Sequence, residues 1–577
     1  MDAAAIAGAL REIASYFDVE GDRFRARAYE RAARAIALAP DVDGLVREGR
    51  LRELPGIGPS LARVIEEISR TGSVGLLTRL RARWPGIIVP LSQLPHVGPE
   101  KARRIHEALA PASLEALAAM CEEGRLRRVR GFGKLSEVRL LEAIRRRKAS
   151  ADDGGLLLHH VARDVTAMLV AHVAGAREAM RVAACGPPRR WMEVADRLAI
   201  AVATHDPDAV RARLRSHPLV LSLAPSERDP ARIAIAALAT GVPCELHTAP
   251  ADRFGQAVVR ATGSAAHVAA LAERARASAG DLDAIAAADE PALYAALGLP
   301  FVPPEVRDGS DEIAAAEGGD DYRDLVTVAD VRGAVHCHTT YSDGKHTVAD
   351  MARAAEERGF EFLTITDHSQ SASYAGGLTI ERLEEQAREI AEAQRGTSVR
   401  LLRGTESDIL ADGALDYPDP VLEQLDVVIA SIHQRHRLDE DGMTRRLVAA
   451  IRKPVFKIWG HPLGRLLLHR EPIACRFDEV LEAIRESPVA VEVNGDPHRL
   501  DLDPQRARRA RAAGARFVLS TDAHSMRQLD HVEAAVGIAR RARIRKHEVL
   551  NAATAEEFAR SIAPHPHTRL RSGSRGG

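Results

Sequence analysis

The carboxyl-terminal part of the chain contains seven short apolar runs, and each run ends on residues that can bind a metal ion or organise a site. Amphipathic segments separate many of the runs, for example 348–358, 380–394 and 504–513. Strands that alternate with helices at about 30-residue spacing predict parallel βα units. The pattern therefore predicts a barrel of about seven units with functional residues at the carboxyl ends of its strands. The runs cover residues 334–335, 362–366, 399–402, 427–432, 455–459, 489–493 and 517–519.

Nitrogen and oxygen ligands gather at or just after these strand ends. Residues i and i+2 of a strand point to the same face, so His336 and His338 can share a metal ion while Cys337 faces away. A lone histidine at a strand end would more often be a packed core residue. Six histidines and three carboxylates favour a metal site, and they are too many for one tetrahedral ion, so two or three ions are expected. The nine residues are His336, His338, Asp343, His368, Glu406, His433, His461, Asp522 and His524.

Closely spaced divalent ions suit phosphoryl displacement, because they stabilise both the attacking and the leaving oxygens. The predicted substrate is therefore a phosphate ester. The ligands lie in the motifs His336-Cys337-His338-Thr339, Ser342-Asp343-Gly344, Thr366-Asp367-His368, Gly404-Thr405-Glu406, Ser431-Ile432-His433, Gly460-His461-Pro462 and Ser520-Thr521-Asp522-Ala523-His524.

These motifs resemble the ligand motifs of the PHP (polymerase and histidinol phosphatase) phosphoesterase family, over residues 333 to about 560. The resemblance implies a (β/α)7 PHP barrel around three divalent ions, with Mn²⁺ expected and Zn²⁺ or Fe²⁺ as alternatives. It also implies catalytic roles for Glu406 and Asp522. Arg499, near Asn494 and His498, either contacts the substrate phosphate or forms a surface salt bridge. The implied ligands are His336, His338, Glu406 and Asp522 for the first ion, Glu406, His433 and His461 for the second, and Asp343, His368 and His524 for the third.

The amino-terminal part is different in character. Apolar residues recur at helical spacing from Ile6 to Ile36, and residues 51–150 hold 19 Arg/Lys against 10 Asp/Glu although the whole chain has a net charge of -1. Three glycine turns in this basic segment expose backbone N–H groups at helix starts, where a phosphate can bind. They resemble helix-hairpin-helix motifs, which grip the DNA backbone without reading bases. The expected DNA-binding residues are Gly56, Gly58, Gly98, Gly131, Gly133 and Lys134.

Between these parts, residues 156–299 are rich in alanine and contain short apolar runs at 198–203, 219–223 and 233–238, which predict mixed α and β structure. The order of the regions is similar, over nearly the whole chain, to that of bacterial family X DNA polymerases. The resemblance implies a helical, lyase-like DNA-binding domain (1–85), a helix-hairpin-helix domain (86–150) and a central α+β nucleotidyltransferase-like domain (151–302). A linker (303–332) and the PHP domain (333–565) follow. Val64 occupies the place of the lyase lysine, so lyase activity is not expected.

The nucleotidyl-transfer motif departs from the family pattern. That pattern has Gly-Ser, two arginines and then an Asp-x-Asp strand that holds two magnesium ions. Here Gly186 and the arginine pair remain, but Pro187 replaces the serine, and the two aspartates fall on Arg197 and Ala199, with Glu245 in the place of the third carboxylate. Asp196 is one residue out of register, which on a strand points it to the other face. Without these carboxylates the phosphoryl charge is not neutralised, so polymerase activity is expected to be lost.

Three functions are compatible with this organisation. The chain is expected to be a metal-dependent DNA phosphoesterase that acts as a 3′–5′ exonuclease or 3′-end processing enzyme, with abasic-site cleavage as a further option. The alternatives are an active polymerase with a PHP exonuclease, and a non-catalytic DNA-binding protein. Gapped or nicked DNA is the expected partner, bound through its backbone. No long apolar stretch predicts a membrane segment, and the five scattered cysteines predict no disulfide framework, so a cytoplasmic, nucleoid-associated protein is expected.

Overall fold

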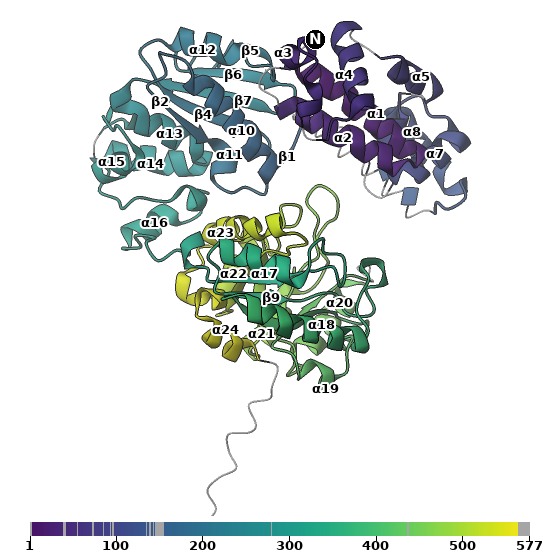
Figure 1. The fold of residues 1–577 in the computed structure, drawn as a ribbon. Helices are drawn as coiled ribbons and strands as arrows, with labels where there is room; N and C mark the ends of the chain where they lie inside the picture. Colours follow the sequence, from purple (N-terminus) through teal and green to yellow (C-terminus); the bar gives the residue numbers. More distant parts are fainter. Residues whose placement is uncertain are drawn as a thin grey trace, which may run out of the picture. The chain divides into compact units, whose positions relative to one another are not determined.

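The computed structural model describes residues 3–38, 42–54, 56–71, 74–84, 86–92, 94, 97–133, 136–137, 140–141, 144, 155–278, 280–434 and 438–563 (Figure 1). The chain forms two compact units. The first contains residues 1–156, 171–178 and 206–246, and the second contains residues 157–170, 179–205 and 247–577. None of the helices in the described part of the chain is long and apolar enough to cross a membrane.

The first unit begins with a helical region whose core follows the predicted spacing. Ile6, Leu10, Ile13 and Phe17 are buried together on one face of α1, next to α2. A hairpin of β5 and β6 also belongs to this unit and follows α12. The elements are α1 (Ala3–Glu20), α2 (Arg23–Leu38), α3 (Val42–Arg47), α4 (Pro59–Thr71), α5 (Gly75–Arg83), α6 (Ile88–Ser92), α7 (Gly98–Leu109), α8 (Leu114–Glu122), α12 (Pro207–Arg215), β5 (Val220–Pro225) and β6 (Ile233–Leu238).

The second unit contains the start of the central region. The strands β2 and β4 pair antiparallel, and Cys185 lies opposite Ala199 in the register. Helix α10 (His159–Ala174) and strand β7 (Pro243–Ala249) each have residues in both units. The other elements are β1 (Leu157–Leu158), β2 (Arg181–Cys185), α11 (Gly186–Arg189), β3 (Val194–Ala195), β4 (Leu198–Ala203), α13 (Phe254–Thr262), α14 (Ala265–Ser278), α15 (Glu290–Ala296) and α16 (Glu312–Glu317).

The segment 303–332, expected to be a linker, is packed against its surroundings. It carries α16, and the Arg307 side chain is fully buried against Glu290. Tyr322 and Leu325 join the same apolar cluster as α14 and α15. The two compact units do not follow the five expected domain boundaries, which stay a prediction.

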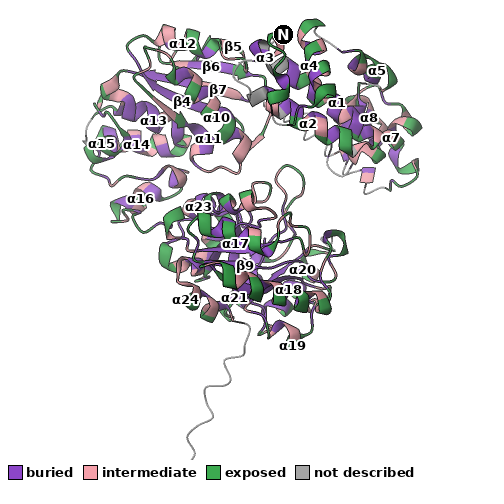
Figure 2. Ribbon diagram, in the orientation of Figure 1, coloured by how far each residue is buried: buried purple, intermediate pink, exposed green. Residues whose placement is uncertain are grey.

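The carboxyl-terminal part forms the predicted seven-stranded parallel barrel, with strand order β14-β13-β12-β11-β10-β9-β8. Figure 2 shows exposed residues on the outer helices and buried residues on the strands. The elements are β8 (Gly333–Cys337), α17 (Val348–Glu357), β9 (Phe362–Ile365), α18 (Ile380–Ala393), β10 (Arg400–Asp408), α19 (Asp419–Leu422), β11 (Val427–Ser431), α20 (Glu440–Ile451), β12 (Ile458–Trp459), α21 (Phe477–Arg485), β13 (Ala490–Asn494), α22 (Pro504–Ala512), β14 (Phe517–Ser520), α23 (Val532–Arg541) and α24 (Ala555–Ile562).

The first and last strands of the barrel meet along a short seam. The amide of Thr521 donates to the carbonyl of Val335 over 3.0 Å. Fully buried Asn551 bridges the same seam: its side-chain amide donates to Gly333 O (3.0 Å) and Leu519 O (2.8 Å), and its Oδ1 accepts from Leu519 N (3.0 Å). The barrel is therefore nearly closed, and one side chain completes the bonds between its ends.

We expect Asn551→Ala to open this seam, because it leaves buried backbone groups of both strands without partners. The free energy of opening of β8 and β14, measured by native-state hydrogen exchange, should fall by about 3 kcal/mol. Gln424→Ala is the matched control, since the Gln424 amide donates to a carbonyl at an exposed position and its loss should change little. Equal protection in the Asn551 variant and the wild type would show that the seam does not need this side chain.

Candidate metal centre

The structure brings all nine predicted ligands together at the carboxyl end of the barrel strands. Their ligand atoms form four groups within which the atoms lie no more than 4.8 Å apart. Because parallel strands all end at the same edge of the barrel, residues far apart in sequence meet here. The groups are His338, Asp343, His368 and His524; His336, His338 and Asp522; His336, Glu406 and His461; and His368, Glu406 and His433.

The buried carboxylate of Glu406, on β10, is the centre of the cluster. Five histidine rings approach its two oxygens, and they come from the carboxyl ends of four strands, β8, β9, β11 and β12, or from the loops just after them. The nitrogen-to-oxygen distances are 2.8 Å for His461, 2.9 Å for His368, 3.1 Å for His433, 3.3 Å for His336 and 3.7 Å for His338. The Nε2 atoms of His433 and His461 lie 3.3 Å apart, so both face the same side of Glu406.

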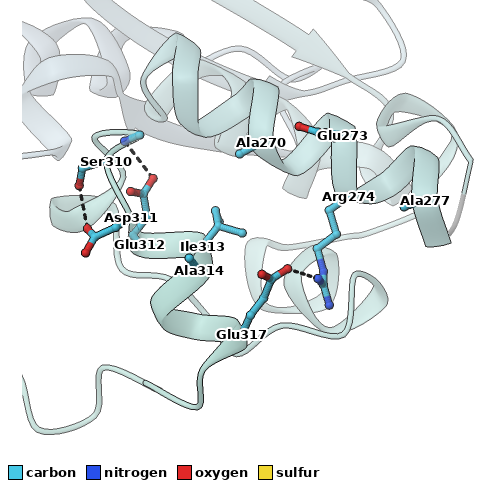
Figure 3. A pocket seen from close by; sticks show the side chains of 11 residues that line it. Ala270, Glu273, Arg274, Ala277, Ser310, Asp311, Glu312, Ile313, Ala314 and Glu317 are labelled. Atoms are coloured by element: carbon cyan, nitrogen blue, oxygen red, sulfur yellow. Dashed lines mark hydrogen bonds and ion pairs between the residues drawn. The ribbon is translucent and has the colours of Figure 1, made fainter.

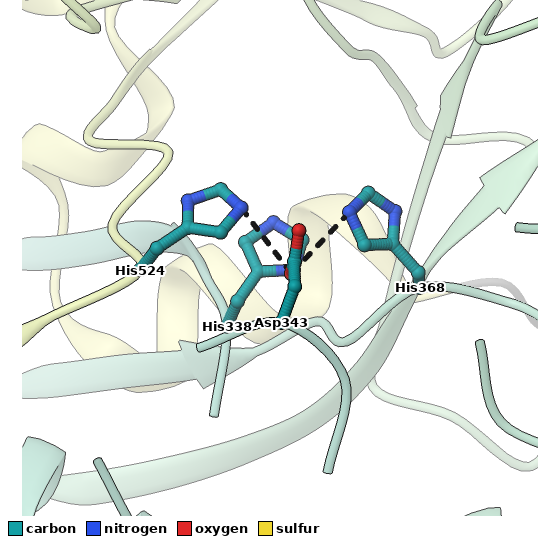
Figure 4. A group of neighbouring side chains, drawn as sticks. All are labelled: His338, Asp343, His368 and His524. Carbon is teal, nitrogen blue, oxygen red and sulfur yellow. Dashed lines mark ion pairs between the residues drawn. The ribbon is translucent and has the colours of Figure 1, made fainter. Parts of the chain in front are cut away.

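A second carboxylate, Asp343, lies at the outer side of the cluster (Figure 4). Its Oδ1 lies 3.3 Å from His524 Nε2, 3.6 Å from His368 Nε2 and 3.8 Å from His338 Nδ1. The Asp343 side chain is 38% exposed, whereas Glu406 is almost fully buried. This group contains the three residues that the PHP resemblance assigns to the third ion, with His338 added.

Two of the candidate ligands have unusual backbone conformations. His336 has φ +65° and Asp522 has φ +47°, both in the left-handed region that residues other than glycine rarely adopt. At the same place the register between β8 and β9 shifts between Ala334 and Cys337. Such strain persists only where the surrounding structure enforces it, and it is common at functional sites. Here the strained backbone accompanies the inward orientation of both side chains, and His336 Nε2 lies 3.8 Å from Asp522 Oδ1.

Two buried carboxylates beside the cluster were missed from the sequence. Glu492 Oε1 lies 2.6 Å from His336 Nδ1, and its Oε2 accepts from the backbone N–H of His461. Asp408 bonds to His433 Nδ1. A histidine that binds a metal through one nitrogen is commonly oriented by an acceptor on the other, and these carboxylates fit that role. A charged residue within the apolar run 489–493, and Asp408 two residues after Glu406, were available signals.

Opposite charges outweigh burial in most of the cluster. Burial opposes the charge of Glu406, but His433, His336 and His368 hold its pKa well below the ordinary value. Burial alone would lower the pKa of His368, yet the charge of Glu406 and the bond to Asp343 raise it to about 10. The pKa of His524 rises to about 9 because its bond to Asp343 and the charge of Asp522 outweigh burial.

His338 shows the opposite behaviour. Burial and the neighbouring His524 and His368 lower its pKa to about 3, which leaves the ring neutral and able to coordinate a cation. Several buried ligand atoms, including His336 Nε2, both ring nitrogens of His338 and Glu406 Oε1, have no hydrogen-bond partner in the described structure. Buried polar atoms of this kind call for a ligand. The donor set of imidazole and carboxylate groups therefore fits divalent cations, whose binding would displace protons from His368 and His524.

Arg499 and Tyr374 lie at the edge of the cluster. The Arg499 Nε atom lies 3.4 Å from Asp522 Oδ2, so the salt bridge that the sequence left open is formed with a candidate ligand. The Nε and Nη1 atoms of Arg499 are buried and make no hydrogen bond in the described structure. The Tyr374 side chain is 65% exposed, and its ring centroid lies 6.2 Å from that of His368 and 6.3 Å from that of His433. An arginine donor beside Asp522 and an exposed aromatic ring beside His368 and His433 thus lie next to candidate ligands.

A separate cavity of about 460 Å³ lies between α14 and the segment 309–317 (Figure 3). Much of its charged lining is engaged within the protein: Arg274 pairs with Glu317, Asp311 pairs with Arg543, and Glu312 accepts from the Gly309 amide. No predicted site residue lines this cavity.

The residues of the nucleotidyl-transfer motif are placed as follows. Ala199 is fully buried on β4, Arg197 lies just before that strand, and Glu245 lies on β7. A Cβ atom on Gly186 would lie 3.1 Å from the Ala199 amide nitrogen, so the glycine and this strand position are neighbours. Asp196 does not lie on a strand, contrary to the prediction, but in the bend between β3 and β4. Its side chain is 60% exposed and lies 3.4 Å from the Arg197 guanidinium.

Arg189, from the arginine pair after Gly186, and His267 on α14 are engaged inside the protein. Arg189 donates to both carboxylate oxygens of Glu290 and to Thr262 Oγ1. His267 is fully buried, with Nδ1 2.6 Å from Glu312 Oε1 and Nε2 2.8 Å from the Tyr294 hydroxyl. The Arg189 guanidinium and both ring nitrogens of His267 are therefore paired within the protein.

Two of the three glycine turns precede helices of the described structure. Gly56 and Gly58 come directly before α4, and Gly98 begins α7. Gly56, Gly98 and Gly131 have φ angles of +81°, +62° and +91°, a conformation that favours glycine. Gly133 follows in the third turn, whereas Lys134 lies outside the described residues. Beside this third turn, Arg104, Arg125, Arg128 and Arg130 line a shallow basic cavity.

Known protein families match three parts of the chain. A helix-hairpin-helix domain matches residues 1–74, a SAM-like helix-hairpin-helix tandem matches residues 88–146, and a PHP domain matches residues 334–496. The PHP match covers seven of the nine candidate ligands.

Similar proteins agree with these matches. The chain is 32% identical to the DNA polymerase/3′-5′ exonuclease PolX of Bacillus subtilis (strain 168), over 94% of this chain and 96% of the relative. A probable phosphatase of Caldanaerobacter subterraneus subsp. tengcongensis is 30% identical over 33% of this chain and 74% of its own length. A probable phosphatase of Thermoanaerobacter sp. (strain X514) is 27% identical over 37% and 88%, respectively. The chain therefore belongs to the PolX family, the family X DNA polymerases with helix-hairpin-helix regions and a PHP domain.

Proposed function

We propose that this protein is a metal-dependent DNA phosphoesterase that processes 3′ ends, as a 3′–5′ exonuclease or 3′-phosphatase, through its PHP barrel. The convergence of six histidines and three carboxylates at one end of the barrel carries this proposal. The Bacillus relative is named a DNA polymerase and 3′-5′ exonuclease, and shorter relatives are named probable phosphatases. Cleavage at abasic sites would use the same chemistry, and both activities belong to the hydrolase class.

The nine residues would hold divalent ions. The family resemblance implies three ions, and Mn²⁺ is the ion that we expect. Such ions supply the positive charge that a phosphoryl displacement requires. The protein's own groups would then position the substrate. The unpartnered Nη1 of Arg499 is available to a phosphate oxygen, since arginine binds phosphate well. The exposed ring of Tyr374 offers a stacking surface for a terminal base, which favours a nucleic acid over a small phosphate ester.

DNA synthesis is proposed to be lost. Arg197 and Ala199 provide no carboxylate, and Arg189 and His267 are held by Glu290 and Glu312. Because the Bacillus relative is also named a DNA polymerase, polymerase activity remains the alternative that an experiment has to exclude. The helix-hairpin-helix regions would bind the backbone of gapped or nicked DNA and present its end to the barrel.

The first test removes two central ligands. We expect His336→Ala/His338→Ala to lower the rate of 3′-end hydrolysis in Mn²⁺ by at least about 1000-fold, equivalent to about 4 kcal/mol of transition-state stabilisation. Release of labelled nucleotides from a primer measures this rate. The matched control is His469→Ala/His547→Ala, which removes two exposed histidines of the same barrel and should leave the rate unchanged. Full activity in the first variant would place the chemistry elsewhere.

The second test concerns synthesis. Template-dependent primer extension should be undetectable with Mg²⁺ or Mn²⁺, because the phosphoryl charge has no carboxylate-held metal pair to neutralise it. The assay should use the His336→Ala/His338→Ala variant as well as the wild type, since hydrolysis by the barrel could erase newly added nucleotides. Sequence-dependent extension by either protein would contradict the proposed loss of polymerase activity.

The third test concerns DNA delivery. Replacing Arg125, Arg128 and Arg130 by Gln should raise KM for gapped DNA and reduce its salt dependence, by about one unit of slope for each lost phosphate contact. The kcat for a small phosphodiester should stay unchanged, because these residues lie outside the barrel. Replacing Arg388, Arg395 and Arg400, which are exposed arginines of the barrel, gives a control with the same change of charge. Equal KM values and salt slopes in the two variants would exclude a delivery role.

A further inference from the structure

The loop between α11 and β4 packs onto the barrel within the second compact unit. A Cβ atom on Gly537 of α23 would lie 2.1 Å from Trp191 Cδ2, so the indole ring lies directly on the helix backbone. The imidazole of His159 stacks on the same indole ring, with 4.2 Å between the ring centroids. The guanidinium carbon of Arg163 lies 4.8 Å from the Trp191 ring centroid. The loop is thus fixed against the barrel next to Glu193.

Glu193 places its carboxylate between two arginines of the barrel. Its Oε1 lies 3.3 Å from Arg465 Nη2 and 3.4 Å from Arg465 Nη1, and its Oε2 accepts from Arg541 Nη1. Arg541 also donates to the carbonyl of Trp191. All three charged side chains are largely buried, with exposures of 10–16%. Burial of this kind makes the loss of one charged partner costly.

Arg465 connects this contact to the edge of the candidate metal centre. Its Nε donates to the carbonyl of Arg499 over 2.9 Å, and its Nη2 donates to the carbonyl of Leu500. Leu500 has φ +45°, a conformation that costs free energy for leucine and needs outside support. The nearby Asp501 carboxylate accepts from the backbone amides of Leu463 and Arg465. One guanidinium therefore holds the two carbonyls that set the direction of the Arg499 side chain.

We infer that Glu193 is a positioning residue for the barrel: through Arg465, it fixes the backbone of Arg499 and Leu500 so that the Arg499 guanidinium faces Asp522 and the substrate phosphate. The role in catalysis rests on the proposed phosphoesterase function. The effect on the loop does not, because it follows from contacts within the protein. The loop that would support nucleotidyl transfer in a polymerase then serves the phosphoesterase site.

The test compares Glu193→Gln with Glu305→Gln in the full-length protein. Glu305 pairs with Arg540 at 2.8 Å in the same unit, and among the described residues this pair does not contact Arg499 or Leu500, so it controls for the loss of a buried ion pair. In the metal-free protein, hydrogen exchange of the peptide 494–503 should rise at least about tenfold in Glu193→Gln and stay unchanged in Glu305→Gln. Arg465→Lys is a second variant with the same expected increase, because lysine cannot hold two carbonyls in a fork.

Kinetic measurements distinguish a positioning role from a merely structural one, because only a positioning role predicts a selective change in kcat. Glu193→Gln should lower kcat for 3′-end hydrolysis about tenfold with KM for DNA nearly unchanged, and should add nothing in an Arg499→Gln background. Additive effects of the two substitutions, or unchanged exchange of peptide 494–503, would overturn the inference. If the wild type shows no hydrolysis with Mn²⁺, the proposed function fails, and the exchange measurement still decides whether Glu193 fixes the loop.

Discussion

A single buried carboxylate dominates the chemistry of the barrel. Glu406 lies within 3.7 Å of a nitrogen on each of five histidines, and four of those rings also contact Glu492, Asp408 or Asp343. A negative charge in this position would be unfavourable without cationic partners. Most of the remaining features, including the strained backbone at His336 and Asp522, bring further ligands to the same few ångströms. The position of these side chains therefore depends on balancing the charge of Glu406 as much as on packing in the barrel core.

The strands and helices of the barrel could be predicted from the sequence, because they depend on local periodicity. All seven strands occur near their expected residues, and the expected helices 348–358, 380–394 and 504–513 correspond to α17, α18 and α22. The nine ligands could be found because parallel strands share one functional edge, so a residue type at a strand end already fixes its neighbourhood. Glu492 and Asp408 were missed because a partner across the barrel depends on register and ring orientation, which spacing along one strand does not contain.

Side-chain pairing and a short bend account for two further differences between the sequence expectations and the structure. The polar segment 303–332 looks like a linker from its composition, yet buried Arg307 pairs with Glu290, and Arg545 pairs with Asp320 and Asp324. The spacing predicts Asp196 on a strand, but β4 begins two residues later, at Leu198. The partner of Arg307 is 17 residues away, whereas the partners of Arg545 are more than 200 residues away, and neither pairing can be read from the composition of the segment. The glycine turns, whose conformation is set locally, were easier to recognise.

The seam of the barrel has a consequence for how the protein is made. Gly333 lies on the first strand, and Asn551, which joins this strand to the last one, is more than 200 residues further along the chain. A ribosome therefore releases β8 long before the partner that completes it exists, and His336 meets Asp522 only when β14 has emerged. Contacts of such long range form slowly, and unpaired strand edges are prone to association while they wait. During synthesis the nascent barrel thus passes through a stage with two open edges, at which chaperone protection would matter most.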